Sequence, residues 1–125
     1  MEKNVLVIDD EQGMRDMFSF ELTRQGYNVS VAAGGEEALG LMEKNDFDIL
    51  FLDMIMPKMY GLEFLKILKD KRKSNAVIVL MTGFCADELI EEAKDLGAAV
   101  CLKKPFDIAC VLDTISKNTG RKGKA

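Results

Sequence analysis

The chain alternates short apolar segments with longer amphipathic ones. Four segments are apolar and rich in β-branched residues, namely 5–8, 49–52, 77–80 and, less strongly, 98–102, and a fifth at 28–32 alternates in part. The first three lack the apolar–polar alternation of a half-buried strand, so both of their faces are expected to be buried. This pattern is typical of a parallel sheet that is covered by helices on both sides.

Helical periodicity fills the intervals between these strands. The pattern predicts a first helix that stops at Gly26, three more over 36–44, 62–72 and 87–96, and a last helix that begins after Asp107, a good N-cap. A chain of five strand–helix units forms a parallel sheet with right-handed crossovers and helices on both faces. We therefore expect a doubly wound α/β fold of three layers.

Charged and hydroxyl side chains follow four of the five predicted strands. In a doubly wound sheet the binding crevice lies beyond the carboxyl ends of the strands. Taken singly, each of these residues has an ordinary structural explanation as a helix cap, a turn hydroxyl or a solvated charge. Their joint occurrence on one predicted edge indicates a site, and they are Asp9, Asp10, Glu11, Asp53, Thr82, Lys103 and Lys104.

Each residue type in this set has a chemical use. Clustered carboxylates do not all stay ionised without a counter-charge, and a divalent cation supplies one. Mg²⁺ prefers a few carboxylates, a carbonyl and waters, and it leaves positions open for phosphate oxygens. One carboxylate can then attack phosphorus to give an aspartyl phosphate, while a lysine and a hydroxyl receive the phosphoryl oxygens.

Composition narrows the function further. The 125 residues make one domain, and no apolar run is long enough for a bilayer span or a signal peptide, which predicts a soluble, cytoplasmic protein. The absence of histidine excludes Ser-His and Cys-His nucleophiles and histidine-ligated metals. A net charge of −4 argues against general nucleic-acid binding by this domain.

The three cysteines fit no zinc pattern. They lie at positions 85, 101 and 110, an odd number with unsuitable spacings, so reduced thiols are the simplest interpretation. Cys85 and Cys110 are interpreted as small buried hydrophobes. Redox sensing at Cys101 is a minor alternative.

The sequence closely resembles the receiver domain of bacterial two-component response regulators over residues 3 to about 118. The resemblance implies a flavodoxin-like (βα)5 fold with strand order 2-1-3-4-5. It also implies that 1–118 form the receiver domain and that 119–125 form a basic tail or the start of a linker. The motifs behind it are VLVIDDE at 5–11, DFDILFLDMIMP at 46–57, MTG at 81–83 and KKPF at 103–106, with shorter matches at 35–39, 61–63 and 96–98.

The resemblance assigns the central roles to three residues. Asp53 would accept a phosphoryl group from a phosphohistidine on a histidine kinase or histidine phosphotransferase. Thr82 would receive a phosphoryl oxygen and move towards it, and Lys104 would pair with the phosphoryl group. The Lys104–Pro105 peptide bond is expected to be cis.

The resemblance also implies a metal site. Asp10 and Asp53 would bind Mg²⁺ directly, with Mn²⁺ as a substitute. Asp9 would help through water, and the backbone carbonyl of Ile55 would complete the protein ligands.

Several positions depart from the family pattern. Cys101 stands where receivers usually have the Tyr or Phe of an aromatic switch, and Tyr60 stands where Asp is common. Gly34 and Gly35 replace the usual polar cap before the second helix. The positions that tune dephosphorylation in the family hold Ile55 and Phe84, which gives two open interpretations: both side chains obstruct the attacking water, or they are ordinary loop apolars.

The expected function is a phosphorylation switch rather than a conventional enzyme, although it would catalyse its own phosphoryl transfer and dephosphorylation. Phosphorylation would change the face formed by the helix at 87–96, the strand at 98–102 and the helix after Asp107, with possible dimerisation, to regulate an effector or partner such as a DNA-binding domain in a longer regulator. A phosphorelay intermediate and a stand-alone docking module remain alternatives. A Mg²⁺-dependent phosphohydrolase is remote, because such enzymes place the nucleophile on the first strand and need a cap.

Overall fold

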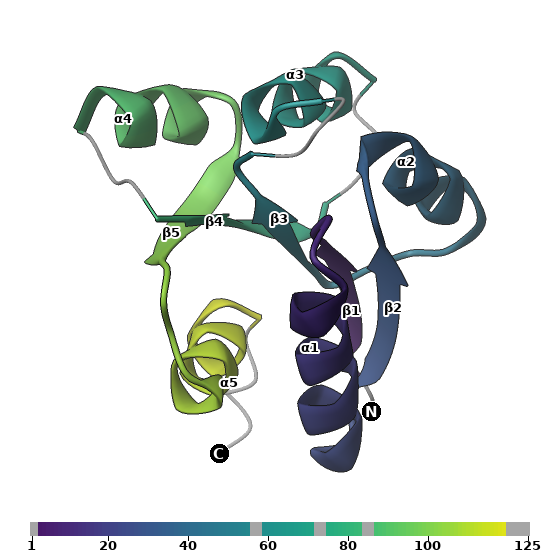
Figure 1. The fold of residues 1–125 in the computed structure, drawn as a ribbon. Helices are drawn as coiled ribbons and strands as arrows, with labels where there is room; N and C mark the ends of the chain where they lie inside the picture. Colours follow the sequence, from purple (N-terminus) through teal and green to yellow (C-terminus); the bar gives the residue numbers. More distant parts are fainter. Residues whose placement is uncertain (1–2, 56–58, 72–74, 84–86, 120–125) are drawn as a thin grey trace.

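The computed structural model describes residues 3–55, 59–71, 75–83 and 87–119. Within these ranges strands and helices alternate strictly, as the sequence predicts (Figure 1). The last three strands extend one or two residues beyond their predicted carboxyl ends, so that Asp53, Thr82 and Lys103 are the last residues of their strands. The elements are β1 (Asn4–Ile8), α1 (Gln12–Arg24), β2 (Asn28–Ala32), α2 (Gly35–Lys44), β3 (Ile49–Asp53), α3 (Gly61–Lys71), β4 (Val77–Thr82), α4 (Asp87–Asp95), β5 (Ala98–Lys103) and α5 (Ile108–Asn118).

The five strands form one parallel sheet. Their order is β2-β1-β3-β4-β5, which confirms the doubly wound, flavodoxin-like topology. The order reverses between β1 and β3, and the carboxyl ends of these two strands lie side by side because Ile8 pairs with Leu52. The residues that follow β1 and β3 are therefore brought together at the switch point of the sheet.

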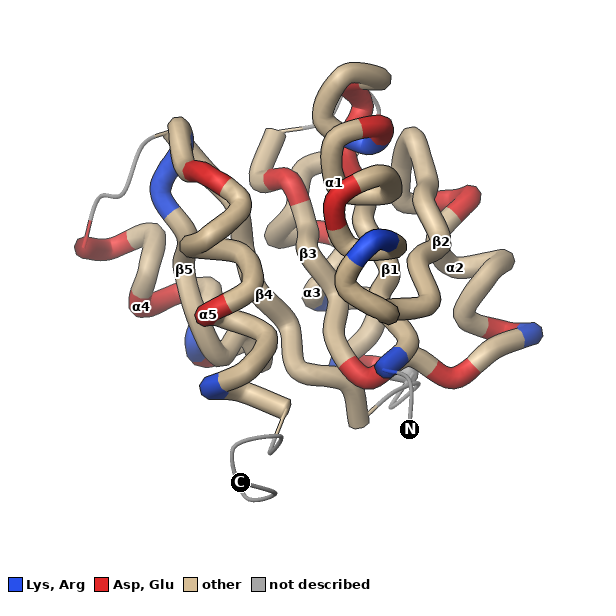
Figure 2. Tube along the Cα trace, turned by 90° about the horizontal axis from the view of Figure 1, so that it is seen from below, with Lys and Arg blue, Asp and Glu red and all other residues tan. Residues whose placement is uncertain are grey.

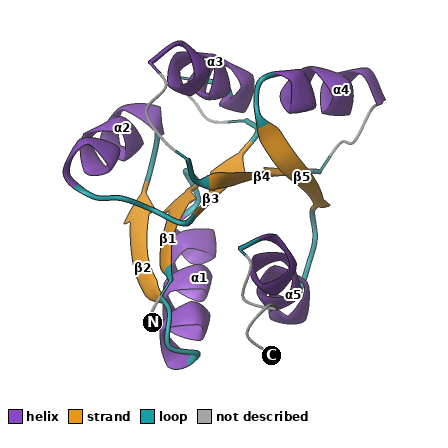
Figure 3. Ribbon diagram, turned by 180° about the vertical axis from the view of Figure 1, so that it is seen from behind, coloured by secondary structure: helices purple, strands orange, loops and turns teal. Residues whose placement is uncertain are grey.

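Each central strand divides its apolar side chains between the two faces of the sheet. In β1, Val5 and Val7 pack with α1 and α5, while Leu6 and Ile8 pack with α2, α3 and α4. Figures 1 and 3 show the same division, with α1 and α5 on one side of the sheet and the other three helices opposite. Because β1, β3 and β4 are buried on both faces, they are almost continuously apolar, as the sequence predicts.

The helix ends follow the sequence signals. Gly26 and Gly97 adopt left-handed conformations just after α1 and α4, with φ of 94° and 109°. Asp107 caps α5 by accepting a hydrogen bond from the Cys110 amide. The interpretation of Cys110 as a buried residue is wrong: the buried residues of α5 are Val111, Thr114 and Ile115, and Cys110 lies on the exposed side.

The charges of α4 are strongly one-sided. Figure 2 shows acidic positions along this helix, and five of its nine residues are exposed acids against one exposed lysine: Asp87, Glu88, Glu91, Glu92, Lys94 and Asp95. Such a surface repels the phosphate backbone of nucleic acids. None of the helices described here is long and apolar enough to cross a membrane.

Phe18 provides a test of the core on the α1 side. Its ring is fully buried and packs against Phe51 at 5.0 Å and Phe106 at 6.1 Å between ring centroids. Phe18→Ala is expected to lower the free energy of unfolding by about 3–5 kcal/mol, because it leaves a cavity among these rings. Urea denaturation measures the change.

Phe20→Ala is the matched control on the same helix. Phe20 is 62% exposed, and its loss is expected to lower the free energy of unfolding by less than about 1 kcal/mol. Equal losses in the two variants would contradict this view of the core.

Candidate functional site

Three carboxylates converge at the carboxyl edge of the sheet. Asp9 and Asp10 follow β1 and Asp53 ends β3, and each offers an oxygen within 4.8 Å of the others. Asp9 and Asp53 are buried, whereas Asp10 is exposed. The sequence-predicted acidic residues are thus brought together, in an arrangement that suits a hard cation held by oxygen ligands.

The local backbone holds the two buried carboxylates in the same way. Asp9 Oδ1 accepts a hydrogen bond from the amide of Glu11 at 2.9 Å, and Asp53 Oδ1 accepts a longer one from the amide of Ile55 at 3.4 Å. In both cases the amide two residues further along the chain donates to the carboxylate, a contact that short acidic side chains form readily in turns.

Arg15 also supports the site, although no pattern in the sequence singles it out. Its guanidinium donates a hydrogen bond to the carbonyl of Asp9 at 2.8 Å, from the first turns of α1. An arginine four residues into a helix is usually a solvated charge. Only the path of the chain from β1 into α1 shows that this one reaches back to the strand end.

Lys104 bridges the two buried carboxylates. Its Nζ lies 3.3 Å from Asp9 Oδ2 and 3.3 Å from Asp53 Oδ1. Its backbone amide donates to the carbonyl of Thr82 at 2.7 Å, which fixes the start of the β5–α5 loop beside the end of β4. The predicted cis bond between Lys104 and Pro105 is confirmed. Burial lowers the pKa of Lys104, but the charges of Asp9 and Asp53 outweigh it, so the pKa is raised and the ammonium is retained.

The ammonium of Lys104 does not fully offset the cost of a negative charge on Asp53. Burial and then the charge of Asp9 raise its pKa from the usual 3.8 to about 6, against the opposing effects of Lys104 and the Ile55 amide. One ammonium therefore does not neutralise the cluster. A further cation at this edge would relieve the remaining repulsion.

The cluster opens to solvent through a shallow hollow. Its volume is about 360 Å³, and its lining includes Asp10, Asp53, Thr82 and Lys104. Thr82 is buried, whereas Ile55 is 64% exposed at the rim of the hollow. A small phosphorylated group can thus approach the Asp53 carboxylate from solvent.

Two further positions singled out in the sequence lie apart from the cluster or outside the described residues. Cys101 is half-buried in β5 and packs against the apolar cluster on the side of α2, α3 and α4. Phe84, like Cys85, Pro57 and the tail from 120 to 125, is outside the described residues.

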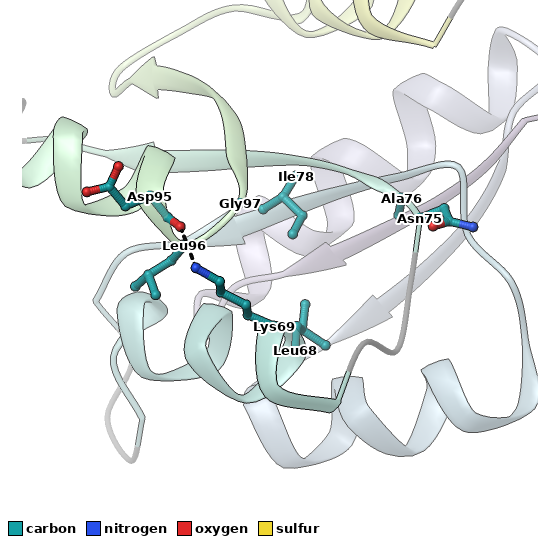
Figure 4. A pocket seen from close by; sticks show the side chains of 8 residues that line it. All are labelled: Leu68, Lys69, Asn75, Ala76, Ile78, Asp95, Leu96 and Gly97. Carbon is teal, nitrogen blue, oxygen red and sulfur yellow. Dashed lines mark hydrogen bonds between the residues drawn. The ribbon is translucent and has the colours of Figure 1, made fainter.

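A second hollow, of about 350 Å³, lies at the opposite edge of the sheet. It is formed where α3 and α4 end and β4 and β5 begin (Figure 4). Across it, the ammonium of Lys69 donates to the carbonyl of Asp95 at 3.0 Å, so that a cation caps the last turn of α4. This contact ties α3 to α4 at the end remote from the acidic cluster.

Comparison with known proteins gives a consistent result. Residues 5–116 match the model of the response regulator receiver domain. Sporulation initiation phosphotransferase F of Bacillus subtilis is 35% identical over 117 residues, which is 94% of each chain. The chain also matches several transcriptional regulatory proteins, of which it spans about half the length.

Solved structures with the same fold include two informative neighbours. Chemotaxis protein CheY4 of Vibrio cholerae is 34% identical, with a TM-score of 0.89 over 94% of this chain and 99% of that one. Response regulator protein TrrA of Thermotoga maritima, solved in complex with Mg(2+)-BeF, is 30% identical, with a TM-score of 0.78 over 92% of this chain and 97% of that one.

The raised pKa of Asp53 predicts a pH-dependent gain in stability for Asp53→Asn in metal-free buffer. The folded protein binds this proton more tightly than the unfolded chain does. The free energy of unfolding of the wild-type protein is therefore expected to fall as pH rises from about 4 to 6, and to stay at its lower value above pH 6. At pH 8 the variant is expected to be more stable by about 2 kcal/mol, with the gain disappearing near pH 4. Urea denaturation at several pH values measures it.

Asp16→Asn is the control for this experiment. Asp16 is an exposed carboxylate on α1, and its replacement is expected to change stability by less than about 0.5 kcal/mol at each pH. A gain for Asp53→Asn that is independent of pH, or matched by Asp16→Asn, would contradict the assigned electrostatics.

Proposed function

Because the chain belongs to the family of response regulator receiver domains, we propose that it is a phosphorylation switch in which Asp53 accepts a phosphoryl group from a phosphohistidine of a histidine kinase or histidine phosphotransferase. The observation that supports this proposal best is the bridge from Lys104 to Asp9 and Asp53 at the edge of an open hollow. A carboxylate held beside an ammonium, with a hydroxyl residue on the next strand, matches the needs of phosphoryl transfer.

In the proposed reaction Asp53 is the nucleophile. A carboxylate oxygen forms a bond to phosphorus as the bond from phosphorus to the donor nitrogen breaks, and the electron pair leaves with the imidazole of the donor. Lys104, already 3.3 Å from the carboxylate, pairs with a phosphoryl oxygen as charge accumulates there. Thr82, buried at the end of β4, supplies its hydroxyl to another phosphoryl oxygen.

The donor set of the cluster fits Mg²⁺. The three carboxylates exceed the one ammonium in charge, and each offers one oxygen that lies within 4.8 Å of those of the other two. In this proposal Asp10 and Asp53 bind the ion, Asp9 acts through water and the carbonyl of Ile55 completes the protein ligands, with Mn²⁺ as a substitute. The ion neutralises charge on the phosphoryl oxygens when it is bound.

The output of the switch is proposed to be the face formed by α4, β5 and α5. β5 is one of the two edge strands and most of its residues are exposed or half-buried, so this face is available to a partner or a second copy. Because a cysteine stands at position 101 in place of an aromatic ring, the coupling is proposed to run through a shift of Thr82 and α4. The same switch can have three outputs. It can control an effector domain in a longer regulator, pass the phosphoryl group on in a phosphorelay, or dock as a single domain on a partner.

The phosphohydrolase alternative finds no support at the site. The proposed acceptor, Asp53, is on β3, whereas such enzymes carry the nucleophile on the first strand. Fast multiple turnover of a phosphodonor would nevertheless favour the phosphohydrolase alternative.

Chemical phosphorylation tests the function. With Mg²⁺ and a small phosphodonor, the protein is expected to form a stoichiometric adduct that is stable in acid and labile in base, and intact mass spectrometry counts it. Asp53→Asn is expected to abolish the adduct, and Lys104→Met is expected to slow its formation by at least about tenfold, because the charge partner is lost. Asp16→Asn serves as the control. An adduct that persists in Asp53→Asn would refute the assignment of the acceptor.

The lifetime of the adduct tests the obstruction hypothesis for Ile55 and Phe84. Ile55 is exposed at the rim of the hollow, where an apolar side chain can shield the phosphoryl group from water. Ile55→Asn and Phe84→Ala are expected to speed the loss of the phosphoryl group by several-fold, measured as the decay of the adduct after the donor is removed. Unchanged decay in both variants would favour the view that they are ordinary loop apolars.

A further inference from the structure

The backbone that carries the candidate acceptor is held from two sides. On one side, the amide of Met54 donates to the carbonyl of Met81 in β4 at 2.9 Å. On the other side, the amide of Gly61, the first residue of α3, donates to the carbonyl of Met54 at 2.7 Å. Met54, the residue that follows Asp53, is therefore held between a strand and the start of a helix.

Gly61 makes this approach possible because it has no side chain. A Cβ atom at this position would lie 2.9 Å from the carbonyl oxygen of Asp53 and 3.0 Å from Cα of Met54. Non-bonded carbon contacts are favourable at about 3.5–4.0 Å, so a methyl group there would force the two backbones apart. The obstructing atoms belong to the backbone, which has no rotamer to change.

The start of α3 has little freedom to move away. The carboxylate of Glu63 accepts a hydrogen bond from the amide of Tyr60 at 3.0 Å, which caps the helix, and Phe64 is fully buried on the next turn. Just before the helix, Met59 packs closely on Gly35 of α2, where a Cβ would lie 2.5 Å from the methionine sulfur. Displacement caused by a side chain at position 61 would therefore fall on Asp53 and Met54.

We propose that Gly61 is a positioning residue for the site: its missing side chain sets the place of the Asp53–Met54 backbone, and through it the Asp53 carboxylate and the Ile55 carbonyl. The role rests on the proposed function, because it concerns phosphoryl transfer to Asp53 and metal binding beside it. A misplacement of about 1 Å at a reacting group can reduce a rate about 100-fold. Gly61 thus acts on the site without touching the substrate.

Gly61→Ala tests this role, with Gly40→Ala as the matched control. Gly40 lies in the interior of α2, and a Cβ there would meet nothing within 4 Å. Gly61→Ala is expected to weaken Mg²⁺ binding and to slow phosphorylation at saturating Mg²⁺ and donor, each by about tenfold or more. Gly40→Ala is expected to leave both unchanged. Gly35→Ala is expected to have a smaller effect than Gly61→Ala, because the flexible side chain of Met59 can move aside.

A third measurement needs neither metal nor donor. In metal-free protein, and leaving aside position 61 and its two chain neighbours, amide NMR shifts of Gly61→Ala are expected to change most at Met54 and Ile55. Addition of MgCl₂ to the same samples gives the Mg²⁺ dissociation constants. If the wild-type chain accepts no phosphoryl group, the proposed function fails, while the shifts and the Mg²⁺ titration still decide the role of Gly61.

Two outcomes would overturn the positioning role. One is a folded Gly61→Ala protein that matches Gly40→Ala in shifts around Met54, in Mg²⁺ affinity and in phosphorylation rate. The other is a Gly61→Ala chain that does not fold at 10 °C even when combined with the stabilising Gly40→Ala change, because Gly61 would then maintain the fold rather than place the site.

Discussion

The bridge from Lys104 to two buried carboxylates is the interaction on which the candidate site depends. Asp9 comes from β1, Asp53 from β3 and the lysine from the loop after β5, so one ammonium joins the ends of three strands. The ammonium compensates the negative charge of the two carboxylates only in part, since the pKa of Asp53 is still raised to about 6. The fold thus holds an acidic cluster whose negative charge is only partly compensated, an arrangement that suits a bound cation.

This residual charge links stability to function. A buried carboxylate that is only partly compensated costs the folded state free energy, and a protein keeps such a feature where the chemistry requires it. The hydrophobic layers on both sides of β1, β3 and β4 provide the compensating stability. The rigid central strands then fix the carboxylates, while the loops beyond them form the open rim.

The sequence predicted the elements well because their signals are local. Uninterrupted apolar strands, helical spacing, the helix stop at Gly26 and the N-cap at Asp107 can each be recognised from neighbouring residues alone, and the structure confirms them. The strand order came from the family resemblance and is also confirmed. Cys110 shows the limit of this approach: its apolar character suggested burial, but the face of a helix that is buried depends on which neighbour it packs against.

By itself, the sequence determined which residue types stand at the carboxyl ends of the strands, and hence that Asp9, Asp10 and Asp53 share one edge with Lys104. Only the tertiary structure decided that the lysine reaches both buried carboxylates, that Arg15 donates to the Asp9 carbonyl and that the start of α3 packs against the backbone of Asp53 and Met54. The physical reason is distance along the chain. Local patterns fix strands and caps, whereas contacts between segments tens of residues apart exist only once the sheet has brought their ends together.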